Sequence, residues 1–168
     1  MTAEERRKGI LDTIRQGDGP HNATVLAKTF GVSRQVVVAD VALLRASGHE
    51  INATPRGYVI GREENGLIRR VACRHCAQDA AQELNIIVDN GCTVLDVVVE
   101  HPIYGELTGA LRLKNRYEVS EFLNSLSHAS PLSILTEGVH LHTVLCPDVQ
   151  AYERVVEQLS ETGILLKE

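Results

Sequence analysis

The sequence predicts an α+β protein built from two parts, and three observations support this prediction. Residues 1–60 show short helical patterns interrupted by glycines, which is typical of a small helical module. The rest of the chain mixes helical and strand-like patterns without strict alternation. Residues 61–66 are polar, contain two glycines and form the best linker candidate. We therefore expect one domain at residues 1–62 and another at residues 67–168.

The charge of the chain is divided between these two parts. Residues 1–70 contain 11 Lys and Arg against 8 Asp and Glu, a net charge of +3. Residues 71–168 contain 6 against 14, a net charge of −8. A mildly basic first part can approach phosphates while an acidic second part stays away from them. This division favours a two-domain regulator over a uniformly acidic enzyme.

Nothing in the sequence resembles a signal for secretion or membrane insertion. The first twenty residues are charged, and no apolar run approaches the roughly 18 residues that cross a bilayer. We expect a cytoplasmic protein without a membrane partner, and hence free thiols at its four cysteines. Cys73 and Cys76 have the spacing of a zinc half-site, but no second pair follows, which argues against a zinc ribbon.

The first part has the pattern of a winged helix-turn-helix. Helical spacing, glycine breaks and a capping serine predict three helices, and two short runs on either side of a turn at residues 54–57 predict a wing. The expected helices are residues 4–16, 24–30 and 34–47, and the expected wing strands are residues 50–52 and 58–60. This order is that of many small DNA-binding modules.

The third helix is the expected recognition helix, with its N-terminal residues outermost in the major groove. Ser33, Arg34 and Gln35 are therefore the first candidates for phosphate and base contacts, and Arg56 is a further candidate at the tip of the wing. Asp40 would repel phosphates, so we expect it to be structural. Three-helix modules also serve as protein-interaction or dimerisation domains, in which case Arg56 is simply solvated.

The second part is expected to form a largely antiparallel sheet with helices packed against it. Strand runs are rich in β-branched residues and end at Asn, Gly or Pro. The expected helices are residues 67–88, 120–127 and 149–161, and the expected strands are residues 92–100, 107–113, 139–146 and 164–166.

Two pairs of residues in this part suit a divalent metal ion. His140 and His142 alternate along a predicted strand, so both imidazoles face one side. His75 and Glu83 lie eight residues apart in the predicted helix and fall along one helical face, with Asp79 midway. We expect Asp79 to orient an imidazole. Three imidazoles and one carboxylate suit zinc, nickel or ferrous iron better than calcium or magnesium.

Three runs of this part resemble the 3H, or three-histidine, domain. They are Ile-Val-Asp-Asn-Gly at residues 87–91, a run ending in His-Pro-Ile-Tyr-Gly at residues 96–105, and a run ending in Gly-Val-His-Leu-His at residues 131–142. The 3H domain is known as the C-terminal half of the niacin-responsive transcriptional repressors of bacteria, which begin with the same type of winged helix-turn-helix. The resemblance spans almost the whole chain.

The resemblance implies a ligand-responsive repressor that acts as a homodimer on double-stranded operator DNA. Nicotinic acid, or a related pyridine, is the implied co-repressor, so that niacin tightens DNA binding at genes for NAD-precursor synthesis or uptake. The metal site of the family carries over to His75, Glu83, His140 and His142, in agreement with the grouping of the residues themselves. The second domain would then bind metal and effector and form the dimer.

Further residues follow from the same resemblance. His101 matches the third named histidine of the family, at a strand end where it contacts a ligand or supports the metal site. Tyr104 is equally compatible with packing and with stacking on a ligand. We do not associate Cys73 and Cys76 with the family pattern, so participation of the Cys76 thiolate stays open.

Two other functions are compatible with the residues. A metalloenzyme fused to a DNA-binding domain also uses His-x-His with a carboxylate. No separate nucleophile, nucleotide-binding glycine loop or evident acid-base pair stands beside the ligands in the sequence, so we expect no enzyme. A pure metal sensor, in which the ion itself is the signal, needs no organic ligand.

Overall fold

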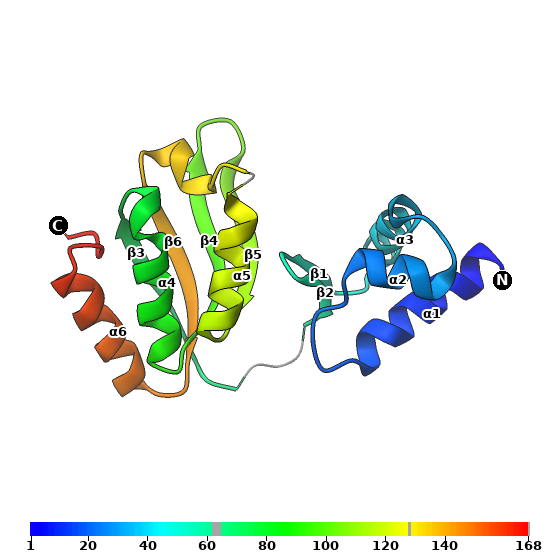
Figure 1. The fold of residues 1–168 in the computed structure, drawn as a ribbon, viewed down its shortest axis with the longest axis horizontal. Coiled ribbons are helices and arrows are strands. Elements are labelled where there is room, and N and C mark those ends of the chain that lie inside the picture. The colour runs from blue at the N-terminus through cyan, green and yellow to red at the C-terminus, as the bar shows by residue number, and fades with distance from the viewer. Residues whose placement is uncertain (62–64, 128, 168) are drawn as a thin grey trace. The chain divides into compact units, whose positions relative to one another are not determined.

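The computed structural model describes residues 1–61, 65–127 and 129–167. It divides into two compact units, residues 1–63 and 64–168, each with its own hydrophobic core (Figure 1). The predicted linker includes residues 62–64, which lie outside the described residues. None of the helices in the described ranges has the length and apolar composition that a bilayer-spanning segment requires.

The first unit contains three helices and a two-stranded wing, as predicted, with boundaries that shift by at most two residues. Its elements are α1 (Ala3–Gln16), α2 (Ala23–Phe30), α3 (Arg34–Ala46), β1 (Ile51–Thr54) and β2 (Gly57–Ile60). Gly31 ends α2 at a φ of +65°, a conformation that glycine adopts without strain, and thereby makes the turn into α3. Ile10, Leu26 and Val37 are fully buried where the three helices meet.

Asp40 joins α3 to α1 in this unit. Arg6 Nε lies 2.6 Å from Asp40 Oδ2, and Arg7 Nη1 lies 3.6 Å from Asp40 Oδ1. Because the Asp40 side chain is buried, it needs such partners to remain charged. The carboxylate is therefore structural, as expected.

The second unit is a four-stranded antiparallel sheet covered on one face by three helices (Figure 1). The strands lie in the order β3-β6-β4-β5. Its elements are β3 (Leu67–Arg74), the 3-10 helix η1 (Ala77–Asp79), α4 (Ala80–Asp89), β4 (Thr93–His101), β5 (Gly105–Leu113), α5 (Arg116–Leu126), the 3-10 helix η2 (Leu132–Thr136), β6 (Val139–Cys146) and α6 (Val149–Glu161). Alternate residues of β6 are buried against the helices.

The helix predicted over residues 67–88 is wrong in its first half. Residues 67–74 form β3, which pairs along its whole length with β6, from Leu67 opposite Cys146 to Arg74 opposite Val139. The run alternates near its end, with Val71 and Cys73 buried, and strand pairing with a distant segment overrides the helical reading. Within the range predicted as helix, the α-helix α4 begins at residue 80 and ends at residue 89. His75 therefore lies in the loop after β3, not on a helix with Glu83.

Two other elements of this unit differ from the predictions by more than two residues. Helix α5 begins at Arg116, four residues earlier than expected, because the Asn115 side chain accepts a hydrogen bond from Glu118 N (2.9 Å) and caps it. The strand expected at residues 164–166 is reduced to one bridge, in which Leu165 pairs with Cys73 at the outer edge of β3.

Candidate metal centre

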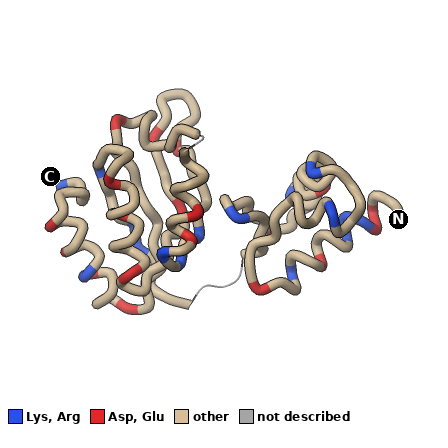
Figure 2. The backbone as a smooth tube through the Cα atoms, in the orientation of Figure 1, with Lys and Arg blue, Asp and Glu red and all other residues tan. Residues whose placement is uncertain are grey.

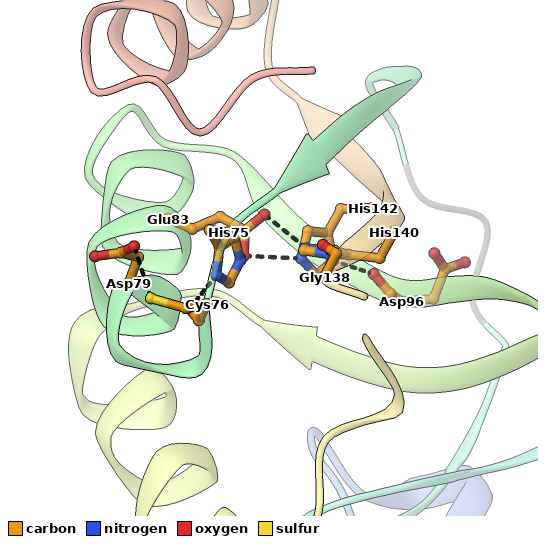
Figure 3. Close-up of polar contacts among 8 residues, drawn as sticks. All are labelled: His75, Cys76, Asp79, Glu83, Asp96, Gly138, His140 and His142. Atoms are coloured by element: carbon orange, nitrogen blue, oxygen red, sulfur yellow. Dashed lines mark hydrogen bonds and ion pairs between the residues drawn. The ribbon is translucent and has the colours of Figure 1, made fainter. Parts of the chain in front are cut away.

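The carboxylate of Glu83 lies at the centre of a buried group of three imidazoles (Figure 3). Its Oε2 lies 2.6 Å from His75 Nε2 and 3.4 Å from His142 Nε2, and its Oε1 lies 2.9 Å from His140 Nε2. The four side chains are at most 5% exposed. The structure thus brings the four predicted metal ligands together, and we call them the Glu83 cluster.

Three elements of the second unit position this cluster. His140 and His142 alternate on β6 and turn to the helix-covered face, as the sequence predicted. Glu83 lies on the buried face of α4. His75 reaches the cluster from the loop after β3, and Gly138 lets that loop approach β6, because a Cβ at Gly138, where φ is +90°, would collide with the His75 carbonyl oxygen.

Main-chain carbonyl groups orient all three imidazoles. Nδ1 of His75 donates to Cys76 O (2.6 Å), Nδ1 of His140 to Gly138 O (2.9 Å), and Nδ1 of His142 to Asp96 O (2.7 Å). A carbonyl oxygen only accepts, so each Nδ1 carries the hydrogen and each neutral ring turns the lone pair of Nε2 toward the carboxylate.

That arrangement requires positive charge inside the cluster. A lone pair facing a carboxylate is repulsive, and the repulsion is relieved either by protons on Nε2 or by a metal cation between the donors. Histidine ligands of metals are held in this way by hydrogen bonds from their second ring nitrogen. The donor set therefore fits a divalent transition metal ion.

The pKa values of the cluster agree with this requirement. Burial lowers the pKa of His75 and of His142, but the hydrogen bonds and charge of Glu83 outweigh it, so both pKa values are raised. Burial raises the pKa of Glu83, yet the three imidazoles hold it well below its usual range. Without metal, the environment of Glu83 therefore favours the protonated forms of His75 and His142.

Cys73 is a potential donor that the sequence suggested only as half of a zinc ribbon, not as a neighbour of the Glu83 cluster. Its Sγ, a carboxylate oxygen of Glu83 and a ring nitrogen of His140 all lie within 4.8 Å of one another. Cys73 is fully buried in β3, opposite His140 in β6, and burial raises the pKa of its thiol. The alternation of Val71 and Cys73 marks the buried face of β3, and the pairing of β3 with β6 places that face beside His140.

The structure also corrects the expectation for Asp79. Its Oδ2 accepts a hydrogen bond from Cys76 Sγ (3.2 Å), and the imidazoles are oriented by main-chain carbonyls instead (Figure 3). The sequence left open whether the Cys76 thiolate binds the metal. Cys76 is exposed, and its sulfur is turned toward Asp79.

A cavity of about 590 Å³ opens beside the cluster. It borders the loop that carries His75, the 3-10 helix η2 and the turn before β6, and its lining includes Arg74, His75, Cys76, Ile134, Glu137 and Gly138. The lining thus combines a basic residue (Arg74), an acidic residue (Glu137), an apolar residue (Ile134) and His75 of the Glu83 cluster.

His101, the last residue of β4, and Tyr104, in the turn between β4 and β5, are not among the residues that line this cavity. His101 Nδ1 accepts hydrogen bonds from Ile103 N (3.1 Å) and Tyr104 N (3.3 Å), and the two rings are 5.0 Å apart. His101 thus stabilises the turn, while Tyr104 is 74% exposed. Their contact with a ligand stays a prediction.

The predicted DNA-binding residues lie on the surface of the first unit. Ser33 caps α3 by accepting a hydrogen bond from Val36 N (3.3 Å), and Arg34 and Gln35 follow it on the exposed first turn. Arg56 is exposed in the turn between β1 and β2. Figure 2 shows basic residues on the helices and wing of this unit, and many acidic residues on the second.

Comparison with known proteins gives matches to both units. A family model described as an HTH domain matches residues 6–59, and one described as the 3H domain matches residues 68–168. The chain is 41% identical over 167 residues to the probable transcription repressor NiaR of Thermotoga maritima, which covers 98% of this chain and 95% of the relative. It is also 41% identical over 174 residues to the transcription repressor NadR of Bacillus subtilis, which covers 100% of this chain and 97% of the relative.

Both relatives match along nearly the whole chain. They therefore share both domains with it, in the same order. The helix-turn-helix gives the protein DNA binding, and the 3H domain makes it a ligand-responsive repressor, not an enzyme. The chain belongs to the family of bacterial transcription repressors that join an N-terminal HTH domain to a C-terminal 3H domain.

Proposed function

We propose that this repressor senses nicotinic acid, or a related pyridine, through a metal ion held by His75, Glu83, His140 and His142. The observation that carries the proposal is the convergence of three Nε2 atoms on one buried carboxylate. Nicotinic acid is the effector that the sequence resemblance implies, and the metal-binding cluster provides a site that can respond to it.

The metal in this proposal is zinc, nickel or ferrous iron. Three imidazoles and one carboxylate are donors of borderline softness, which suit these ions better than magnesium or calcium. When bound, the ion supplies a Lewis-acidic position that a carboxylate or a pyridine nitrogen can occupy. The protein residues fix that position through their main-chain hydrogen bonds.

The cavity beside His75 is the proposed effector site. Arg74 offers a guanidinium group to the carboxylate of nicotinate, and Ile134 offers an apolar contact to the ring. The cavity volume of about 590 Å³ lies within the range of small-molecule sites. His101 and Tyr104 contribute to ligand binding in this proposal if the effector extends to the β4–β5 turn.

The response to the effector requires a homodimer in the cytoplasm, where operator DNA is found. Operators read by helix-turn-helix dimers contain half-sites about one helical turn, or a multiple, apart. Effector and metal would favour the dimer arrangement in which the spacing of Ser33, Arg34 and Gln35 in the two protomers matches those half-sites. Coupling energies of this kind are typically about 1 to 3 kcal/mol, or about 5- to 150-fold in affinity.

The test is a titration of DNA with full-length protein loaded with zinc, nickel or ferrous iron, with and without nicotinate. The DNA is a site selected in vitro by the same protein, and benzoate, which lacks the pyridine nitrogen, is the control ligand. We expect nicotinate to tighten DNA binding at least about fivefold and benzoate to have little effect. Equal DNA affinity with and without nicotinate in every metal-loaded form would refute the effector assignment.

A pure metal sensor is the second candidate, because the Glu83 cluster is complete without an organic ligand. In that case, metal alone changes DNA affinity and nicotinate adds nothing. A response to nicotinate in chelator-treated protein would exclude this second candidate.

A further inference from the structure

We propose that Cys73 is a further metal-binding residue and that its thiolate binds the same ion as the Glu83 cluster. This inference rests on the proposed metal centre. Cys73 is not one of the four metal ligands that the sequence and its family resemblance predict.

The position of Cys73 supports direct contact with the ion. Cys73 lies opposite His140 across the β3–β6 pair, and both side chains are buried. Its Sγ lies within 4.8 Å of a carboxylate oxygen of Glu83 and of a ring nitrogen of His140. Donor atoms of Cys73, Glu83 and His140 thus lie close enough together for one ion to be held between them.

The formal charge of the centre favours a second anionic donor. A divalent ion with one carboxylate and three neutral imidazoles leaves a charge of +1 among side chains that are at most 5% exposed. Uncompensated charge is costly to bury. When the Cys73 thiol binds the ion it releases its proton to solvent, and the resulting thiolate brings the formal charge of the centre to zero.

The other cysteines do not share this position. Cys76 is exposed and donates a hydrogen bond to Asp79. Cys146 lies six residues after His140 on β6, which is about 20 Å along an extended strand. Cys92 Sγ donates a hydrogen bond to Asn90 O (4.0 Å) after the end of α4. Cys76 is therefore a matched control, since it is a cysteine near the cluster whose sulfur has a different partner.

A thiolate also changes which ions the centre prefers. Sulfur donors favour zinc, cobalt and nickel over manganese, because these ions accept softer ligands. Cys73 should therefore give this chain a stronger preference for zinc than its four other ligands would.

Cobalt is a suitable probe, because visible bands report its binding and a near-ultraviolet charge-transfer band reports a thiolate ligand. Full-length wild type, Cys73→Ser and Cys76→Ser are titrated with Co²⁺ under reducing conditions. We expect wild type and Cys76→Ser to show both signals. We expect Cys73→Ser to keep the visible bands and lose the charge-transfer band.

X-ray absorption of zinc-loaded wild type and Cys76→Ser gives a second measurement that does not depend on the folding of Cys73→Ser. We expect a sulfur neighbour at about 2.3 Å from zinc in both proteins. If wild type shows the visible bands without the charge-transfer band, or if its zinc has no sulfur neighbour, Cys73 is not a ligand. The proposed centre of His75, Glu83, His140 and His142 would then stand without it. Absence of cobalt and zinc binding overturns both proposals.

Discussion

His140 and Glu83 are 57 residues apart in the chain, yet His140 Nε2 lies 2.9 Å from Glu83 Oε1 and both side chains are 2% exposed. The contact joins the central strand β6 to α4, so it connects the sheet to the helices that cover it. Because the Nδ1 hydrogen of His140 is used by Gly138 O, the contact needs a proton or a metal ion to be favourable.

The first prediction concerns the carboxylate. Glu83→Gln should weaken zinc binding by more than about 100-fold, beyond the loss expected for a group that only supports a ligand. The amide removes the anionic donor while keeping the size of the side chain. Competition with a chromophoric chelator measures the affinity, and Glu121→Gln, an exposed change on α5, is the control. Unchanged zinc affinity in Glu83→Gln would rule out Glu83 as a ligand.

The second prediction is the pH dependence of stability in metal-free protein. The raised pKa values of His75 and His142 contribute stability that is present below about pH 6.5 and is lost as pH rises through their folded-state values. The lowered pKa of Glu83 contributes stability above about pH 4.3, which is lost as pH falls through its folded-state value.

The free energy of unfolding of metal-free protein should therefore be greatest between about pH 4.3 and 6.5 as far as this cluster contributes. Urea unfolding in the presence of a chelator measures it. Glu83→Gln should flatten the dependence, because its amide cannot stabilise protonated histidine. A wild-type profile that keeps rising through pH 8 in parallel with Glu83→Gln would contradict the assigned directions.

The third prediction concerns the close approach of Gly138 to His75. Gly138→Ala should cost about 1 to 3 kcal/mol of stability from backbone strain and should weaken zinc binding, because the loop carrying His75 must move. Gly163→Ala is matched in strain, since Gly163 has a φ of +75° and open space around it. Zinc affinity that falls equally in both variants would show that strain alone is responsible.

The fourth prediction concerns the DNA-binding surface. Arg34→Ala and Arg56→Ala should each weaken DNA binding. Loss of a phosphate contact should also reduce the slope of the logarithm of the binding constant against the logarithm of salt concentration by about 1. Arg154→Ala, in the second unit, is the control. Fluorescence anisotropy over a range of salt concentrations gives both values. Salt slopes that match wild type in both variants would place the phosphate contacts elsewhere.

Local patterns in the sequence determined most of the first unit and β6. The helix cap at Ser33, the turn at Gly31 and the alternation of His140 and His142 depend on neighbours within a few residues. These features could therefore be predicted, and so could the presence of an imidazole pair on one face of a strand. The charge difference between the two parts was likewise determined by composition alone.

Tertiary structure decided the remaining features of the site. Residues 67–74 fit a helix or a strand by local pattern, and their pairing with β6, about seventy residues later, selected the strand. That pairing moved His75 into a loop and brought Cys73 opposite His140. Spacing along the chain cannot reveal such a neighbour, because the distance between Cys73 and His140 is set by hydrogen bonds between strands that meet only in the folded protein.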